Sequence, residues 1–298
     1  MNVNANYMQQ LTAALSRSTA QQQALSSEIS SGVRLSGLGD DPNAASQNVQ
    51  FSARIAADST FTQTASTTTS MMQVADSTLG SVVDQINHAI SVATAGNNGT
   101  NNASDQSSVA AELTSIRDEI LGLANTSYSG KYLFSGSQNG SQPFQLDTST
   151  SPASVTYTGD NVVNHVSTPG GQSIATNLPG QQVFTATGGD LLGTLNALIQ
   201  GFSSGNTAAT TSLTSQLGAA LSQVSTQRAS LDGAINRFQS TSSYASEEQT
   251  QLLANQTNLL QADLPTVATQ ISSNQTQQSA LESVIVTIEK QGTLFDRM

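Results

Sequence analysis

Side chains that could act as acids, bases, nucleophiles or metal ligands are sparse in this chain of 298 residues. It has two histidines, His88 and His165, and no cysteine. A secreted hydrolase or an adhesin built on the middle of the chain would have to use Asp147, Asp160 and His165, which match no catalytic pattern. The residues therefore predict a protein that is not an enzyme and that holds no cofactor and no metal.

One stretch does concentrate glycine and acidic residues: ISSGVRLSGLGDDPNAASQ, residues 29–47. Such a stretch can bind phosphate, bind a metal or join two helices. A dinucleotide-binding turn would need a third glycine in its motif and a preceding strand, and a P-loop would need Gly-Lys-Ser/Thr. A calcium loop would need oxygen ligands at alternate positions and a closing glutamate, whereas only Asp40 and Asp41 are present. The pattern favours a joint between two helices.

Helix capping accounts for the same residues. Asp41 suits an N-cap and Pro42 the first helical position, while Asp40 adds negative charge near the positive end of the helix dipole. Glycines before them let the chain change direction. The predicted helix joint consists of Gly32, Arg34, Gly37, Asp40, Asp41 and Pro42.

The two ends of the chain each carry apolar residues at alternating spacings of three and four, as in a coiled-coil helix. Each helix therefore has one narrow apolar stripe, which can be buried against the other helix or against neighbouring chains. Ser18 and Gln22 interrupt the first stripe, and Asn274 and Gln278 interrupt the second. We expect terminal helices that are marginal in the monomer and ordered by assembly. The predicted assembly seam comprises Leu11, Leu15, Leu25, Ile29, Leu264, Ile271, Leu281, Ile285 and Ile288.

Between the ends, helical spacing recurs on both sides of a segment with a different character. Residues 131–189 contain short alternating pieces, KYLFSGS, ASVTYTGD, NVVNHVST and QQVFTAT, separated by turn residues. The sequence predicts a mainly α fold with a β-rich insertion: a long antiparallel helical bundle or coiled coil formed by the N- and C-terminal segments, plus a small outer β domain. The predicted divisions are terminal coiled-coil segments 1–40 and 264–298, a helical body of 41–130 and 190–263, and the β-rich outer domain 131–189.

Composition narrows the range of partners. The formal net charge is −11, which argues against nucleic acid and against an anionic membrane surface. Charged residues make up only 10% of the chain, and a polar surface with few charges suits packing against copies of the same chain. No apolar run approaches the ~20 residues that span a bilayer. The N-terminus MNVNANYMQQL has no basic region and no apolar core, so we expect no cleavable signal peptide.

Several stretches resemble one protein family. SSGVRLSGLGDDPNAA, residues 30–45, resembles the N-terminal signature shared by flagellins and hook-associated proteins. LANTSYSGKYLFSGSQNGSQPF, residues 123–144, is similar to the stretch that leads into the family's β domain. QRASLDGAINRFQ and the ending ALESVIVTIEKQGTLFDRM resemble its C-terminal helix and tail. Pro42 looks more like the hook-associated protein 3 branch than like flagellin. The matching residues at the start of the β insertion are Tyr132, Phe134, Gly136, Pro143 and Phe144.

The resemblance implies a structural subunit of the bacterial flagellum that joins the hook, through hook-associated protein 1, to the flagellin filament. It implies a ring of copies, with the terminal helices forming an inner tube and the β insertion facing outward. Export would use the flagellar type III pathway, and a cytosolic export chaperone would hold the C-terminal helix. The protein would be secreted and would lie at the extracellular hook–filament junction. The alternative reading is a flagellin-type subunit of the filament itself.

Overall fold

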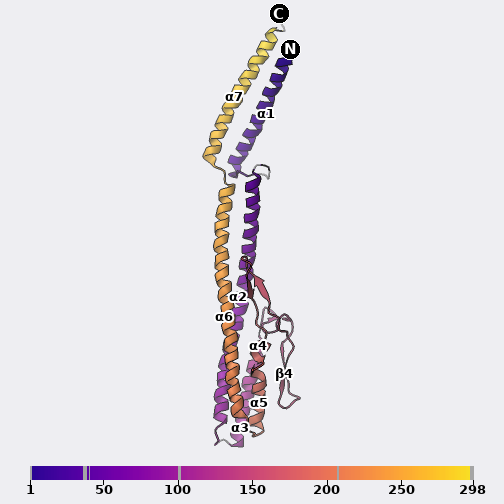
Figure 1. The fold of residues 1–298 in the computed structure, drawn as a ribbon, viewed down its shortest axis with the longest axis vertical. Coiled ribbons are helices and arrows are strands. Elements are labelled where there is room, and N and C mark those ends of the chain that lie inside the picture. The colour runs from indigo at the N-terminus through magenta and orange to yellow at the C-terminus, as the bar shows by residue number, and fades with distance from the viewer. Residues whose placement is uncertain (1, 36–38, 40, 100–101, 207, 296–298) are drawn as a thin grey trace. The chain divides into compact units, whose positions relative to one another are not determined.

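The computed structural model describes residues 2–35, 39, 41–99, 102–206 and 208–295. The chain divides into two compact units. Unit 1 comprises Met1–Ala56 with Glu248–Met298, and unit 2 comprises Ala57–Glu247. Both units are mainly helical, and the strands all belong to unit 2 (Figure 1). The predicted fold class, mainly α with a β-rich insertion, is confirmed.

Seven helices and eight short strands follow one another along the described chain. The helices are α1 (Asn2–Ser31), α2 (Pro42–Gly96), α3 (Ala103–Ala124), α4 (Gln181–Phe184), α5 (Leu191–Ser203), α6 (Thr210–Leu260) and α7 (Leu264–Phe295). The strands are β1 (Ser127–Tyr128), β2 (Lys131–Tyr132), β3 (Phe144–Asp147), β4 (Ser154–Tyr157), β5 (His165–Ser167), β6 (Ser173–Ala175), β7 (Thr185–Ala186) and β8 (Gly189–Asp190).

In unit 1, α1 packs along α7 in antiparallel orientation, so that the two ends of the chain lie side by side (Figure 1). The beginning of α2 lies beside the end of α6 within the same unit. Arg54 binds Glu248 through two hydrogen bonds of 3.0 and 3.2 Å, and the Gln256 amide donates to Asn48 at 2.7 Å. The predicted antiparallel pairing of the N- and C-terminal segments is therefore present within one chain.

Unit 2 is built on a helical core that the apolar spacing predicts. The stripe residues of α2 are all nearly inaccessible: Met72, Ala75, Leu79, Val82, Ile86, Ala89 and Ala93. They meet Leu113, Ile116 and Ile120 of α3 in one continuous hydrophobic cluster, which α5 and α6 complete. Phe61 stacks on Phe238 with ring centroids 6.3 Å apart, which holds α2 against α6.

Local capping explains where the shorter helices begin. The Asn102 side chain accepts hydrogen bonds from the backbone N–H groups of Ser104 (2.8 Å) and Asp105 (3.0 Å), and the Asp105 carboxylate accepts from the N–H of Asn102. This reciprocal capping box satisfies donors that the first turn of α3 would otherwise leave unpaired. Asp190 caps α5 with a single bond, by accepting from the N–H of Gly193 at 2.9 Å.

The strands pair as four separate antiparallel hairpins, β1 with β2, β3 with β4, β5 with β6, and β7 with β8. One expectation was wrong here, because the piece QQVFTAT begins as the short helix α4 and only its end forms β7. Val183 and Phe184 are consecutive and both fully buried. Successive side chains of a strand point to opposite faces, whereas a helical turn can direct both into one core.

Among the described residues, none of the helices has the length and apolar character that crossing a membrane requires.

Candidate assembly interface

The helix joint begins at Gly32, which follows the last residue of α1. Its φ of +68° lies in the left-handed region that favours glycine, and its N–H still bonds to the carbonyl of Glu28 at 2.9 Å. On the other side, Pro42 is the first residue of α2, and the Asp41 carboxylate accepts from the N–H of Ala44 at 3.1 Å. That N–H, together with the nearby Arg34 guanidinium, lowers the pKa of Asp41.

Of the remaining predicted joint residues, Arg34 is described by the structure and two others are not. Gly37 and Asp40 lie outside the described residues. Arg34 connects three parts of the joint: its guanidinium lies 3.3 Å from the Asp41 carboxylate and donates to the carbonyl of Leu259 at 3.2 Å. Its backbone N–H also donates to the carbonyl of Leu260 at 2.7 Å.

A second helix break, between α6 and α7, faces this joint within unit 1. Val33 forms an antiparallel bridge with Gln261, and the N–H of Ala262 donates to the carbonyl of Gly32 at 3.0 Å. Asp263 then precedes α7 as its cap, since its carboxylate accepts from the backbone N–H of Thr266 at 3.4 Å and from the Thr266 hydroxyl at 2.7 Å. The two breaks are therefore tied together by backbone hydrogen bonds.

The predicted seam residues differ in burial. Leu25 is buried, with 7% of its surface exposed. Leu11, Leu15, Ile271, Leu281, Ile285 and Ile288 are half-buried. Ile29 and Leu264, which flank the joint, are 40% and 48% exposed. Pairing of α1 with α7 within one chain thus leaves much of the predicted seam accessible.

Exposed large hydrophobic side chains gather in unit 1. In the described part of the chain, unit 2 contributes only Val162 and Tyr244 to this group. The members in unit 1 are Tyr7, Ile29, Val33, Val49, Leu253, Leu264, Val284 and Val286. These residues are spread along the helices of unit 1, where neighbouring chains that pack along the helices could bury them. We name these eight residues the apolar surface of unit 1.

At the start of the β insertion, the residues of the family pattern form a buried aromatic cluster. Phe134 and Phe144 are fully buried, and each ring lies 5.3 Å from that of Phe184 in an edge-to-face arrangement. Pro143 is also buried, and Tyr132 is half-buried. These residues therefore anchor the insertion to the helices of unit 2.

Gly136 lies in close contact with Asp160 next to this aromatic cluster. Gly136 has a φ of +73°, and a Cβ at this position would overlap the carboxylate of Asp160. That carboxylate accepts from the N–H of Ser137 at 2.8 Å and from the Ser137 hydroxyl, which lowers the pKa of Asp160. The Tyr157 hydroxyl lies within hydrogen-bond distance of the carbonyl oxygens of Phe134 (3.0 Å) and Asp160 (2.8 Å), and its single proton is donated to one of them at a time.

Sequence reasoning missed this Tyr157–Asp160 network. The piece ASVTYTGD was noted only as a strand, and its acidic residue only as a weak candidate for catalysis. The Asp160 oxygens are instead engaged by Ser137 and by the N–H of Val162, at 3.1 Å for the latter. The signal that could have revealed the network is the Tyr-x-Gly-Asp end of the strand, a turn sequence whose aspartate can accept backbone N–H groups.

The histidines form no cluster. His88 on α2 lies 3.2 Å from the Glu112 carboxylate on α3, with both side chains 52% exposed, and His165 lies exposed on β5. No group of three or more potential metal ligands was found in the parts of the chain that the structure describes.

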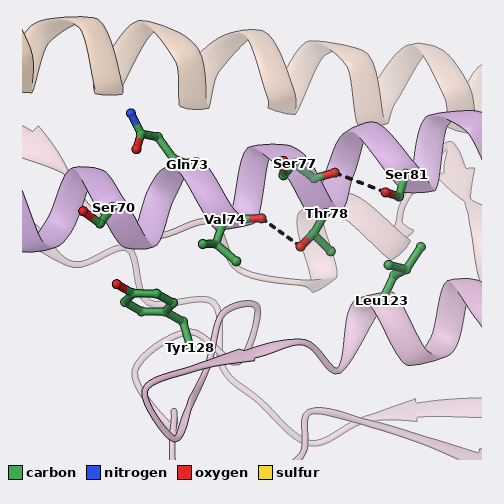
Figure 2. A pocket seen from close by; sticks show the side chains of 8 residues that line it. All are labelled: Ser70, Gln73, Val74, Ser77, Thr78, Ser81, Leu123 and Tyr128. Carbon is green, nitrogen blue, oxygen red and sulfur yellow. Dashed lines mark hydrogen bonds between the residues drawn. The ribbon is translucent and has the colours of Figure 1, made fainter.

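A shallow hollow of about 580 Å³ lies in unit 2 between α2, the end of α3 and β1 (Figure 2). Two hydroxyl groups in its wall donate to carbonyls of their own helix. Thr78 donates to the carbonyl of Val74 at 2.8 Å, and Ser81 donates to that of Ser77 at 3.4 Å (Figure 2).

The sequence of this chain is similar to those of known flagellar proteins. Residues 2–139 match the bacterial flagellin N-terminal helical region. Flagellar hook-associated protein 3 of Escherichia coli is 30% identical over 192 residues, which are 57% of this chain and 60% of that protein. The N-terminal part of the chain is thus similar to flagellins, and a larger part of it is similar to hook-associated protein 3. The matched region spans less than two thirds of this relative.

Two solved structures share the fold. Flagellar hook-associated protein 3 from Legionella pneumophila aligns with a TM-score of 0.64 at 14% identity, over 70% of this chain and 98% of that one. The flagellar junction protein FlgL from the same organism aligns with a TM-score of 0.55 at 15% identity, over 64% of this chain and 99% of that one.

Proposed function

We propose that this flagellin-like protein is a structural subunit of the bacterial flagellum that joins the hook to the flagellin filament. The observation that carries the proposal is the apolar surface of unit 1, on the unit where the N- and C-terminal helices pair. A free subunit gains nothing from such a surface, whereas a subunit packed among copies of itself buries it. The homology to a protein named for its association with the hook, and the shared fold with a protein named for the junction, support the same role.

The proposal assigns a part to each predicted segment. Residues 1–40 and 264–298 line the inner tube of a ring, residues 41–130 and 190–263 form the body, and residues 131–189 face outward. The subunit contacts copies of itself, hook-associated protein 1 on the hook side and flagellin on the filament side. A cytosolic chaperone holds the C-terminal helix before type III export. The role is mechanical, and no catalytic step is part of it.

A filament subunit is the second candidate, because the match to the flagellin N-terminal region suits flagellin as well as a junction protein. The buried contacts do not distinguish the two, since both would pack through unit 1. Electron microscopy of a strain that lacks the gene, together with an assay of flagellin in the medium, separates them.

A junction protein predicts hooks without filaments and flagellin lost to the medium. Loss of all filament protein from cells and medium would instead identify a flagellin, and normal attached filaments would contradict both roles. Complementation with the Leu281→Glu variant should fail to restore attachment. The Glu282→Gln variant, at the neighbouring exposed position, should restore it.

A further inference from the structure

Two Asn-Gly pairs occur in the chain, Asn98–Gly99 and Asn139–Gly140. Such a pair can deamidate without an enzyme when the backbone nitrogen of the glycine attacks the side-chain amide carbon of the asparagine. A new C–N bond closes a succinimide ring, and the side-chain nitrogen leaves as ammonia with the proton of the attacking N–H. Water then opens the ring to give aspartate or isoaspartate. Glycine favours the attack because it has no Cβ to hinder it.

The structure leaves the Asn98–Gly99 pair open to this reaction. Both residues are exposed in the connection between α2 and α3. A Cβ built on Gly99 would meet no atom within 4 Å. Among the described residues, no hydrogen bond engages the Asn98 side chain or the N–H of Gly99, while the N–H of Asn98 itself donates to the carbonyl of Ala95 at 3.2 Å. The glycine nitrogen can therefore turn towards the side-chain amide.

The asparagine immediately before this pair is held in place instead. The Asn97 amide donates to the Thr214 hydroxyl at 3.2 Å, and its side-chain oxygen accepts from the Thr210 hydroxyl at 2.5 Å. Both partners lie at the start of α6. Because its side chain is engaged and the next residue is not glycine, Asn97 should not react.

The second Asn-Gly pair is more constrained than the first. Asn139 is half-buried in the β insertion, and its carbonyl accepts from the N–H of Tyr132 at 2.9 Å. That carbonyl and the Gly140 nitrogen belong to one planar peptide group, so turning the nitrogen towards the side chain moves the carbonyl away from Tyr132. The net value of one such hydrogen bond corresponds to roughly a two- to tenfold slower reaction.

We propose that Asn98 is a site of spontaneous covalent modification, where the amide is converted to aspartate or isoaspartate, and that the fold protects Asn97 and Asn139. Either product adds a negative charge just after the end of α2, near the negative end of its helix dipole. Isoaspartate also inserts a methylene into the main chain beside Asn97. The modification therefore changes both the charge and the backbone of this connection. This inference rests on the chemistry of the chain and does not depend on the flagellar role.

Peptide mapping by mass spectrometry tests the proposal. The purified full-length chain is incubated at mildly alkaline pH, and the acid and amide forms of each asparagine are counted over time. We expect Asn98 to be converted roughly two- to tenfold faster than Asn139, the ratio that the Tyr132 hydrogen bond provides, with Asn97 unchanged. In concentrated urea the two Asn-Gly pairs should react at similar rates, because the fold no longer distinguishes them.

Two matched variants separate this site from the other. Gly99→Val should slow the conversion of Asn98 by roughly tenfold or more, because a β-branched side chain crowds the attacking nitrogen. Gly140→Val should leave the rate at Asn98 unchanged. The proposal is overturned if the folded chain converts Asn139 as fast as Asn98, or if the difference between them persists in urea. It is equally overturned if Gly99→Val leaves the rate at Asn98 at the parent value.

Discussion

Gly180 offers a sharp test of how the β insertion is anchored. Gly180 is buried, and its N–H donates to the carbonyl of Phe134 at 2.7 Å. A Cβ added to Gly180 would lie 2.7 Å from that carbonyl oxygen and 2.7 Å from two ring atoms of Phe144. The Gly180→Ala change must therefore move the backbone or the ring within a packed cluster.

The expected cost follows from these contacts. Overpacking a closely packed core costs roughly 1–3 kcal/mol. Loss of the hydrogen bond to the Phe134 carbonyl adds about 0.5–1.5 kcal/mol. We expect unit 2 to lose about 2–4 kcal/mol, which lowers the melting temperature of a domain of this size by roughly 5–15 °C. Thermal unfolding followed by circular dichroism measures this shift.

Gly140→Ala is the matched control, because a Cβ there meets no atom within 4 Å, and its melting temperature should stay near that of the parent. A double-mutant cycle adds a second check. Phe144→Leu is destabilising by itself, but it removes the ring atoms that the new Cβ meets, so the two changes together should cost less than the sum of their separate effects. The proposed contact does not anchor the insertion if Gly180→Ala has the same melting temperature as Gly140→Ala. The same conclusion follows if the losses of stability caused by Gly180→Ala and Phe144→Leu simply add in the double variant.

Three further predictions concern capping, ionisation and the division into units. Asp41→Ala should speed amide exchange at Ala44, whereas Asp41→Asn should keep exchange at that position slow. Because the pKa of Asp41 is lowered in the folded chain, the stability that its charge adds is present above pH 3.8 and is lost as the pH falls further. An acid titration of unfolding measures this loss. Burial raises the pKa of Tyr157 to about 12, so its share of stability is present below pH 10 and is lost as the pH rises towards 12; ultraviolet titration should show one late tyrosine, absent in Tyr157→Phe. Leu231→Glu should destabilise unit 2 by about 3 kcal/mol or more, because a charge replaces a buried side chain. Leu281→Glu, in unit 1, should leave the unfolding transition of unit 2 unchanged. If calorimetry shows that both variants destabilise unit 2 equally, the two units do not unfold independently.

The features that the sequence predicted well depend on neighbouring residues. Asp41 caps α2 and Pro42 begins it because capping involves only atoms within one turn. The stripe from Met72 to Ala93 is buried because its spacing leaves only one apolar face to bury. Gln181–Phe184 was mistaken for a strand since four residues carry too little periodicity to distinguish the two structures.

The features that sequence reasoning missed join residues far apart in the chain. The hydrogen bond from Ser137 to Asp160 depends on how two turns of the β insertion meet. Arg34 was assigned to the joint, but its bond to the carbonyl of Leu259 depends on the pairing of the two ends of the chain. A backbone carbonyl has no sequence signature, so a contact of this kind cannot be found in advance.

By itself, the sequence determined the helices, the position of the joint and the presence of seams at both ends, because side-chain periodicity and capping chemistry are local properties. Only the tertiary structure decided that α1 pairs with α7 in the register of Ser18 and Asn274. Register is a property of two helices together. Here it is set by the Ser18–Asn274 pair together with the backbone hydrogen bond between Gly32 and Ala262, and neither can be found from one helix alone.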